Sequence, residues 1–245
     1  RLSTVVLAST PEMQQVFAQL GIRAGIMPTI GLNLAELPFH PRAIGDGPLR
    51  ILFVGKLINW KGIDLAIEAL ARSGVKATFT LIGSGNYLDT ARRLAGRLGL
   101  AERVLFRGWM PRVEVLKIYQ DYDVFLFPSL HDTGGYALIE AMSNELPAIC
   151  LDCGGPAVAV REGCGVKVPL GTRQTVIKGL ADAIRFYDQD RSRLLAHGRA
   201  ARQSVLRHYD WQRKASEMDA IYQAATAFRP SGNSPMPAGR PGSAD

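Results

Sequence analysis

The stretch VFLFPSLHDTGGYALIEAMSNELPAICL, residues 124–151, reads as a strand, a loop, a helix and a second strand. The strand candidates Val124–Phe127 and 147–151 are continuous apolar runs, which is typical of strands buried on both faces. A helix candidate, residues 137–142, separates them. Two strands joined by a helical crossover form a parallel β-α-β unit, so this stretch predicts an α/β fold.

The same alternation runs along most of the chain. It predicts a Rossmann-like, doubly wound parallel sheet with a helical C-terminus, in which ligands bind in the loops that follow the strands. The further strand candidates are Leu49–Val54, Ala77–Ile82, 103–106 and 166–168, and the helix candidates between them are 64–71, 87–98 and 114–120.

The ends of the chain differ from this central part. Residues 1–28 read as a separate strand-helix-strand piece, with an apolar strand at residues 3–9. A linker rich in Pro and Gly, residues 29–48, precedes the main domain, residues 49–228. Residues 229–245 are rich in Pro, Gly and Ser and are expected to be disordered.

Composition indicates a soluble globular protein, with 47% hydrophobic and 21% charged residues. No stretch approaches the roughly 18 uninterrupted apolar residues of a membrane span. The net charge of +7 is concentrated in residues 173–214, which carry ten Lys/Arg against four Asp/Glu in a helical pattern. This face is either solvated or in contact with an anionic membrane surface. No aromatic interleaving supports nucleic-acid binding.

The pair Cys150 and Cys153 forms a C-x-x-C motif, and Cys164 is the third cysteine. A tetrahedral zinc site needs four ligands, and no second paired motif exists. Redox pairs usually sit at a helix N-terminus, whereas this pair follows a strand and leads into Gly154-Gly155-Pro156. We therefore expect free thiols in a reducing compartment, and no metal site.

Two glycine-containing loops follow predicted strands. The first places Lys56 and Lys61 between Gly55 and Gly62, where ammonium groups and helix amides would favour a diphosphate. The alternative is a pair of solvated lysines. The second loop, residues 83–85, lacks the third glycine of a dinucleotide fingerprint, so it indicates a tight turn beside a ligand and not a nicotinamide site.

The loop and helix of the opening stretch carry two carboxylates. Asp132 follows a strand, and Gly134 and Gly135 let the backbone pass close to a ligand, with amides at Gly135 and Tyr136 available to an anion. Glu140 lies in an apolar helix, where an ionised carboxylate needs hydrogen-bond donors. A ribose diol supplies two donors, and a buried Glu-Arg pair is the alternative. The loops together suggest a nucleotide sugar.

Several motifs resemble those of the retaining family-4 (group 1) glycosyltransferases of GT-B architecture. The likeness covers residues 49–169 and concerns the C-terminal, donor-binding domain of that family. Gly55-Lys56…Lys61-Gly62 is similar to its diphosphate site. Phe127-Pro128-Ser129 with Asp132…Glu140-Ala141-Met142 resembles its Pro-Ser…Glu-x7-Glu-Ala-Met signature, and Gly154-Gly155 matches its Gly-Gly pair.

The resemblance implies a role for each matching residue. Glu140 would hold the nucleotide ribose, and Asp132 would meet hydroxyls of the transferred sugar. Lys56 and Lys61 would neutralise the diphosphate leaving group, helped by the amides of Gly135 and Tyr136. The loop that contains Trp109 and Met110 would lie near the base.

Three departures from the family pattern bear on these roles. Lys56 stands where Arg is usual and exchanges a bidentate fork for a point charge. Asp132 replaces a Glu and is one methylene shorter, so contact with the sugar would shift. Asn144-Glu145 replaces a small residue and a glycine.

By this resemblance, the protein is expected to be a hexosyltransferase that uses a nucleotide diphosphate sugar, without a metal, and retains the anomeric configuration. A sugar or lipid-linked acceptor in polysaccharide or glycolipid assembly is implied, with a location in the cytoplasm, free or at the inner face of the membrane. Residues 1–28 resemble only the last part of an N-terminal acceptor domain. Two alternatives remain: a catalytically silent module that binds nucleotide sugar, and a nicotinamide-dependent oxidoreductase.

Overall fold

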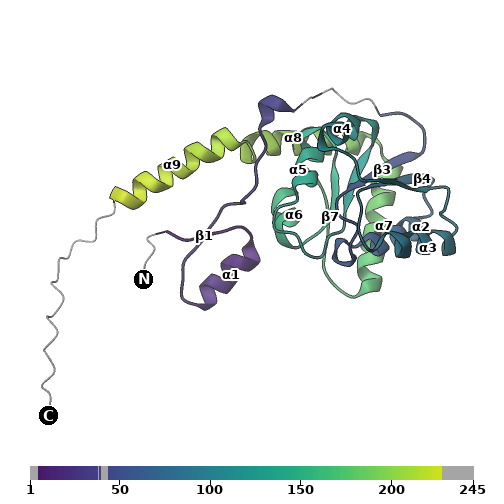
Figure 1. Cartoon of the computed structure of the whole chain (residues 1–245), viewed down its shortest axis with the longest axis horizontal. Helices are drawn as coiled ribbons and strands as arrows, with labels where there is room; N and C mark the ends of the chain where they lie inside the picture. The colour runs from purple at the N-terminus through teal and green to yellow at the C-terminus, as the bar shows by residue number, and fades with distance from the viewer. Residues whose placement is uncertain (1–4, 38, 40–43, 228–245) are drawn as a thin grey trace, which may run out of the picture.

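A six-stranded parallel sheet forms the centre of the computed structural model, which describes residues 5–37, 39 and 44–227. The strand order is β5-β4-β3-β6-β7-β8, which confirms the predicted doubly wound α/β fold (Figure 1). The strands are β3 (Leu49–Val54), β4 (Ala77–Ile82), β5 (Val104–Gly108), β6 (Val124–Phe127), β7 (Ala148–Leu151) and β8 (Gly165–Val168).

The central strands have the bounds that their apolar runs predicted. All four residues of β6 are buried, and Pro128, which cannot continue a central strand, follows it directly. On the neighbouring strand, Phe53 stacks on Phe127 with ring centroids 5.8 Å apart. Burial on both faces therefore fixes these strands, as expected for a parallel sheet covered by helices.

Helices cover both faces of the sheet. Figure 1 shows α2, α3 and α7 grouped on one side, and α2 packs against both α3 and α7; on the other side, α5 packs against α8. These helices and their neighbours are α2 (Ile63–Ser73), α3 (Leu88–Arg97), α4 (Arg112–Ile118), α5 (Tyr136–Ser143), α6 (Gly154–Ala159), α7 (Arg173–Gln189), α8 (Ser192–His208) and α9 (Trp211–Ala227), with short 3-10 turns η2 (Asn59–Lys61) and η3 (Tyr119–Asp121).

The sequence analysis missed helix α6. We predicted no helix at Gly154-Gly155-Pro156, but Cys153 is the N-cap of α6 and Pro156 is its third residue. Proline is tolerated in the first helical turn, because its missing N–H would have no partner there. The statement that the cysteine pair does not lead into a helix was therefore wrong.

A buried ion pair fixes the register of β3 against β6. Asp123, whose side chain is 3% exposed, accepts hydrogen bonds from the Arg50 backbone N–H at 2.8 Å, from Nε at 3.1 Å and from Nη2 at 2.8 Å. The side-chain hydrogen bond to Asp123 raises the pKa of the Arg50 guanidinium. The pair ties the N-terminal end of β3 to the residue before β6.

The N-terminal residues form a small two-stranded parallel sheet with one helix: β1 (Leu7–Ala8), α1 (Pro11–Gln19) and β2 (Gly25–Ile26), with η1 (Leu34–Glu36) after it. Hydrogen bonds join it to the rest of the chain, and two of these contacts define its position. Glu12 accepts a hydrogen bond from the Gly154 N–H at 2.9 Å. Leu32 forms a two-bond backbone bridge, donating to Tyr209 at 2.7 Å and accepting from Trp211 at 3.1 Å. The assignment of residues 1–28 to a second domain remains a prediction, and the predicted tail lies outside the described residues.

Candidate functional site

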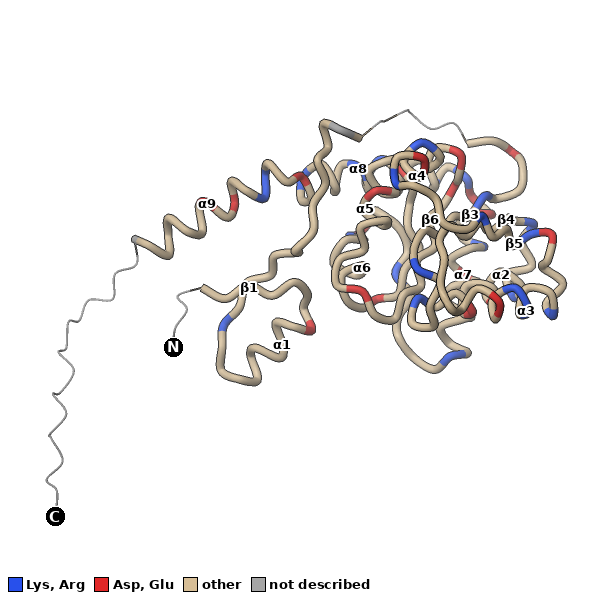
Figure 2. The backbone as a smooth tube through the Cα atoms, viewed as in Figure 1, with Lys and Arg blue, Asp and Glu red and all other residues tan. Residues whose placement is uncertain are grey.

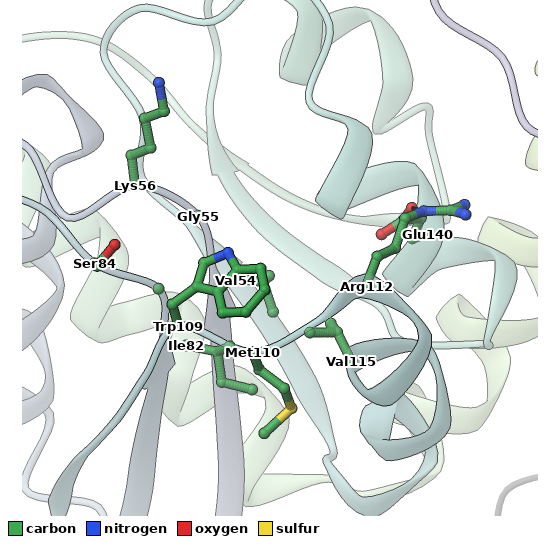
Figure 3. Close-up of a pocket in the computed structure, with 11 residues that line it drawn as sticks. Val54, Gly55, Lys56, Ile82, Ser84, Trp109, Met110, Arg112, Val115 and Glu140 are labelled. Carbon is green, nitrogen blue, oxygen red and sulfur yellow. Dashed lines mark hydrogen bonds and ion pairs between the residues drawn. The ribbon is translucent and has the colours of Figure 1, made fainter.

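The strand order reverses between β3 and β6, and a crevice opens at their carboxyl ends. In open α/β sheets this is the position where ligands bind. A cavity of about 400 Å³ lies there. It is lined by Val54, Gly55, Lys56, Ile82, Gly83, Ser84, Trp109, Met110, Arg112, Val115 and Glu140 (Figure 3). Five residues predicted from the sequence therefore share one cavity: Gly55, Lys56, Trp109, Met110 and Glu140.

Two glycine loops in close backbone contact form part of the cavity wall. The Gly55 N–H donates to Ile82 O at 3.0 Å, and the Gly83 N–H donates to Gly108 O at 2.7 Å. Gly83 has a φ of +138°, and a Cβ at this position would lie 1.9 Å from the Gly55 carbonyl oxygen. Glycine is thus required because two loops touch here, which agrees with the tight turn inferred from the sequence.

Lys56 and Trp109 lie at the mouth of this cavity. Figure 3 shows the Lys56 side chain extending outward from the loop after β3, and its ammonium has no acidic partner among the described residues. Trp109 is 72% exposed, although it is a large apolar side chain. An unpaired cation and an exposed indole at one opening suit a ligand that has both a negative charge and a flat ring.

Glu140 is buried in the cavity wall, with 5% of its surface exposed. Its Oε1 accepts a hydrogen bond from Arg112 Nε at 2.6 Å, and its Oε2 accepts one from the Tyr119 hydroxyl at 3.2 Å. Burial and the nearby charge of Glu140 raise the pKa of the Tyr119 hydroxyl well above its usual value. The Glu-Arg pair that we named as the alternative is therefore present. However, the Arg112 side chain is 60% exposed at the rim of the cavity, and the cavity beside the pair is open.

The remaining predicted residues form a second cluster outside the cavity lining. Asp132 Oδ1 accepts hydrogen bonds from the N–H groups of Gly134 at 3.0 Å and Gly135 at 2.7 Å, and Oδ2 pairs with the Lys61 ammonium. Of the two amides that we expected to receive a diphosphate, Gly135 and Tyr136, the Gly135 amide instead donates to the Asp132 carboxylate. Tyr136, the first residue of α5, is 50% exposed and does not line the cavity.

Arg112 and Tyr119 are the two functional candidates that the sequence analysis missed. Both lie on one segment, α4 continued by η3, and both contact the only acid in the cavity lining. The chain contains 29 Lys and Arg residues, so the rule that a buried acid needs a partner did not identify this one.

Within the described residues, no group of three or more His, Cys, Asp and Glu side chains is placed to hold a metal ion. The three cysteines are free thiols. Burial raises the pKa of Cys150 to about 12 and also raises the pKa of Cys153. Both thiols are therefore protonated near neutral pH, which disfavours thiolate chemistry even though Cys153 caps a helix.

Ion pairs occupy much of the basic surface of α7 and of the turn into α8; Figure 2 shows where the basic and acidic residues lie along the chain. Five of the ten cations in residues 173–214 have acidic partners: Arg173, Lys178, Arg185, Arg191 and Arg193. This pairing favours a solvated face. Of the helices that the structure describes, none combines the length and apolar character needed to cross a bilayer.

Comparison with known proteins gives a consistent result. The family model described as Glycosyl transferases group 1 matches residues 39–203. A glycogen synthase of Mycobacterium tuberculosis is 29% identical over 198 residues, covering 80% of this chain and 47% of that protein. A D-inositol 3-phosphate glycosyltransferase of Xylanimonas cellulosilytica is 31% identical over 194 residues, covering 76% and 44%. The chain thus spans about half the length of the curated relatives it matches.

Solved structures share the fold. A sucrose-phosphate synthase from Thermosynechococcus elongatus superimposes with a TM-score of 0.75 at 24% identity, covering 92% of this chain and 59% of that one. The Anabaena protein Alr3699/HepE, in complex with UDP and glucose, gives a TM-score of 0.73 at 20% identity, covering 92% and 64%. At these identities the likeness establishes the architecture alone.

Proposed function

Because the chain belongs to the group 1 glycosyl transferases, we propose that it binds the donor of a reaction that transfers a hexose from a nucleotide diphosphate sugar to an acceptor, with retention of configuration. One observation carries the proposal. A buried carboxylate, Glu140, and an unpaired cation, Lys56, share an open cavity at the switch point of the sheet. A vicinal diol and a diphosphate satisfy these two groups together.

The donor is assigned to the site part by part. The base lies against Trp109 and Met110, the ribose hydroxyls donate to Glu140, and the diphosphate lies near Lys56 at the Gly55 loop. These residues line the same cavity, whose volume of about 400 Å³ is in the range of small-molecule sites. The transferred sugar then projects toward the neighbouring cluster of Lys61 and Asp132, outside the cavity.

The chemistry that follows is stabilisation of a leaving group. As the bond from the sugar to the diphosphate breaks, negative charge develops on the diphosphate, and the ammonium of Lys56 stabilises it without a metal. Lys61 contributes once its ammonium leaves Asp132. The described residues of the cavity offer no general base, so the acceptor and its activation belong to another part of the protein.

An acceptor-binding half is accordingly part of the proposal. We propose that residues 1–28 are the end of an N-terminal acceptor domain; the chain covers 47% of the M. tuberculosis glycogen synthase and 44% of the X. cellulosilytica enzyme, which is compatible with a further half. The same coverage, with the mutual pairing of Lys61 and Asp132, favours a second candidate: a module that binds nucleotide sugar without transferring it. A transfer assay on this chain, with and without an N-terminal half, distinguishes the two.

Nucleotide binding is the direct test. Isothermal titration with UDP, GDP and ADP should show binding of at least one, and Glu140→Ala should weaken it strongly. Glu114→Ala, which removes an exposed acid from helix α4, is the matched control and should bind as wild type does. A folded wild-type sample that binds none of the three nucleotides would refute the proposed donor site.

The acceptor class and the location are proposed from the family resemblance and are equally open to test. We propose a sugar or lipid-linked acceptor in polysaccharide or glycolipid assembly, handled in the cytoplasm or at the inner face of the membrane. Co-sedimentation with vesicles of increasing anionic lipid content tests the membrane contact. Pairing of half of the basic residues in residues 173–214 predicts that any such contact is weak.

A further inference from the structure

The carboxylate of Glu140 is held by two residues of a single segment. Arg112 is the first residue of α4, and Tyr119 begins the 3-10 turn η3 that continues it. They are seven positions apart, which is about two helical turns, so both side chains lie on the same face of the segment. The segment therefore presents two donors in fixed positions to one acid on the neighbouring helix α5.

Arg112 and Tyr119 leave hydrogen-bond acceptor sites free on the Glu140 carboxylate. Within the described residues, Arg112 uses only Nε, at 2.6 Å from Oε1, and not the two-pronged contact that a guanidinium can make. Tyr119 adds one hydrogen bond at 3.2 Å to Oε2. An ionised carboxylate accepts about four hydrogen bonds. Each Glu140 oxygen thus keeps one lone pair, and the residue lines the open cavity.

Arg112 is the counter-ion of Glu140. The acid is 5% exposed, and Arg112 is the only cation that an ion pair joins to it among the described residues. A buried carboxylate without a cation is costly in its charged form, and a protonated one offers fewer acceptor sites. Removal of Arg112 therefore leaves the acid without its counter-ion and without the hydrogen bond that orients Oε1.

We propose that Arg112 is a positioning residue for a vicinal diol: together with Tyr119 it orients the Glu140 carboxylate, with one free lone pair on each oxygen. The inference rests on the proposed function, since it takes the diol to be a nucleotide ribose. Arg112 itself does not contact the diol. Substitution of Arg112 must therefore weaken the binding of ligands that carry the two hydroxyls and leave the binding of ligands that lack them unchanged.

The experiment compares UDP, GDP and ADP with their 2′,3′-dideoxy counterparts by isothermal titration. The measured quantity is the ratio of the dideoxy Kd to the ribo Kd. For wild type we expect about 100-fold, roughly tenfold for each hydrogen bond to a charged acceptor. Arg112→Met should reduce the ratio to about fivefold or less, and Arg112→Lys should give an intermediate value. Tyr119→Phe should lower it less than Arg112→Met.

Control variants separate positioning from folding. Arg107→Met removes an exposed arginine of β5 that does not line the cavity, and should keep the wild-type ratio. Glu140→Gln should bring the ratio close to one. If Arg112→Met weakens ribo and dideoxy ligands equally, or leaves the ratio at the wild-type value, the positioning role is wrong while the donor site stands. If wild type binds no nucleotide, the proposed function fails and this inference with it.

Discussion

Replacing Asp132 by Asn should separate the two tasks of this side chain. Its Oδ1 accepts the N–H groups of Gly134 and Gly135, while its Oδ2 pairs with Lys61. Asparagine keeps an oxygen for the two amides but loses the charge that holds Lys61. Alanine loses both. The pair of variants therefore distinguishes the ion pair from the ordering of the glycine loop.

The environment of the pair sets the size of the effect. The side chains of Asp132 and Lys61 are 14% and 15% exposed. Exposed pairs contribute about 0–1 kcal/mol and breaking a buried one costs about 3–5 kcal/mol, so we expect Asp132→Asn to lose about 2 kcal/mol of unfolding free energy. Alanine adds two unsatisfied amides, at about 1 kcal/mol each, for a loss of about 4 kcal/mol.

Nucleotide binding should change in the opposite direction. In Asp132→Asn the ammonium of Lys61 no longer has a carboxylate partner, so it can contact a diphosphate. We expect the affinity for the nucleoside diphosphate that binds wild type to rise about fivefold, equivalent to about 1 kcal/mol. The affinity for the corresponding nucleotide sugar should gain less, because the proposed contact of Asp132 with the sugar is weakened at the same time.

Urea denaturation and calorimetric titration measure the two effects. Asp152→Asn is the matched control: it breaks the pair of Asp152 with Lys167, whose side chains are 46% and 38% exposed, and should cost less than about 1 kcal/mol. An Asp132→Asn protein that is as stable as wild type and binds the diphosphate equally would refute the view that Asp132 sequesters Lys61. The stability measurement decides this even if no nucleotide binds.

Three further predictions follow from the described contacts. Asp123→Ala leaves the guanidinium of Arg50 without its buried partner and should lower the unfolding free energy by about 3 kcal/mol, visible as a lower urea midpoint; an unchanged midpoint would contradict the register role. Burial raises the pKa of Cys150 to about 12, so at pH 8 this thiol is more protonated in the native than in the unfolded chain; iodoacetamide should label it only after denaturation, as read by mass spectrometry. Trp109 is 72% exposed at the cavity, so a bound nucleotide should quench its fluorescence, and Trp109→Phe should lose that signal; quenching that persists in the variant would place the base elsewhere.

The strands could be predicted from the sequence because a strand that is buried on both faces is a continuous run of apolar residues. Leu49–Val54, Ala77–Ile82 and Val124–Phe127 are apolar runs closed by glycine or proline, and the structure gives each strand the predicted bounds. Helix α6 was not predictable in this way, since Gly154, Gly155 and Pro156 usually interrupt helices. Its position depends on contacts with other loops: the Gly155 N–H donates to Asp132 O at 2.8 Å.

The residues of the candidate site were largely identifiable from the sequence, but their pairing was not. Topology brings loops after parallel strands to one edge, which is why Lys56 and Glu140 meet in one cavity. Lys61 and Asp132 are 71 positions apart, and Arg112 and Glu140 are 28 apart. No periodicity specifies such partners, because the choice among many charged side chains is made by packing in three dimensions.

The bridge at Leu32 determines how the N-terminal piece can move. The chain crosses between this piece and the sheet once near residue 32 and again near residue 210, and backbone hydrogen bonds of 2.7 Å and 3.1 Å join the two crossings. Two connections held side by side resist torsion more than a single linker does. The N-terminal piece is also held by the hydrogen bond from the Gly154 N–H to Glu12, at a point away from these two crossings, so its rotation about them is restricted.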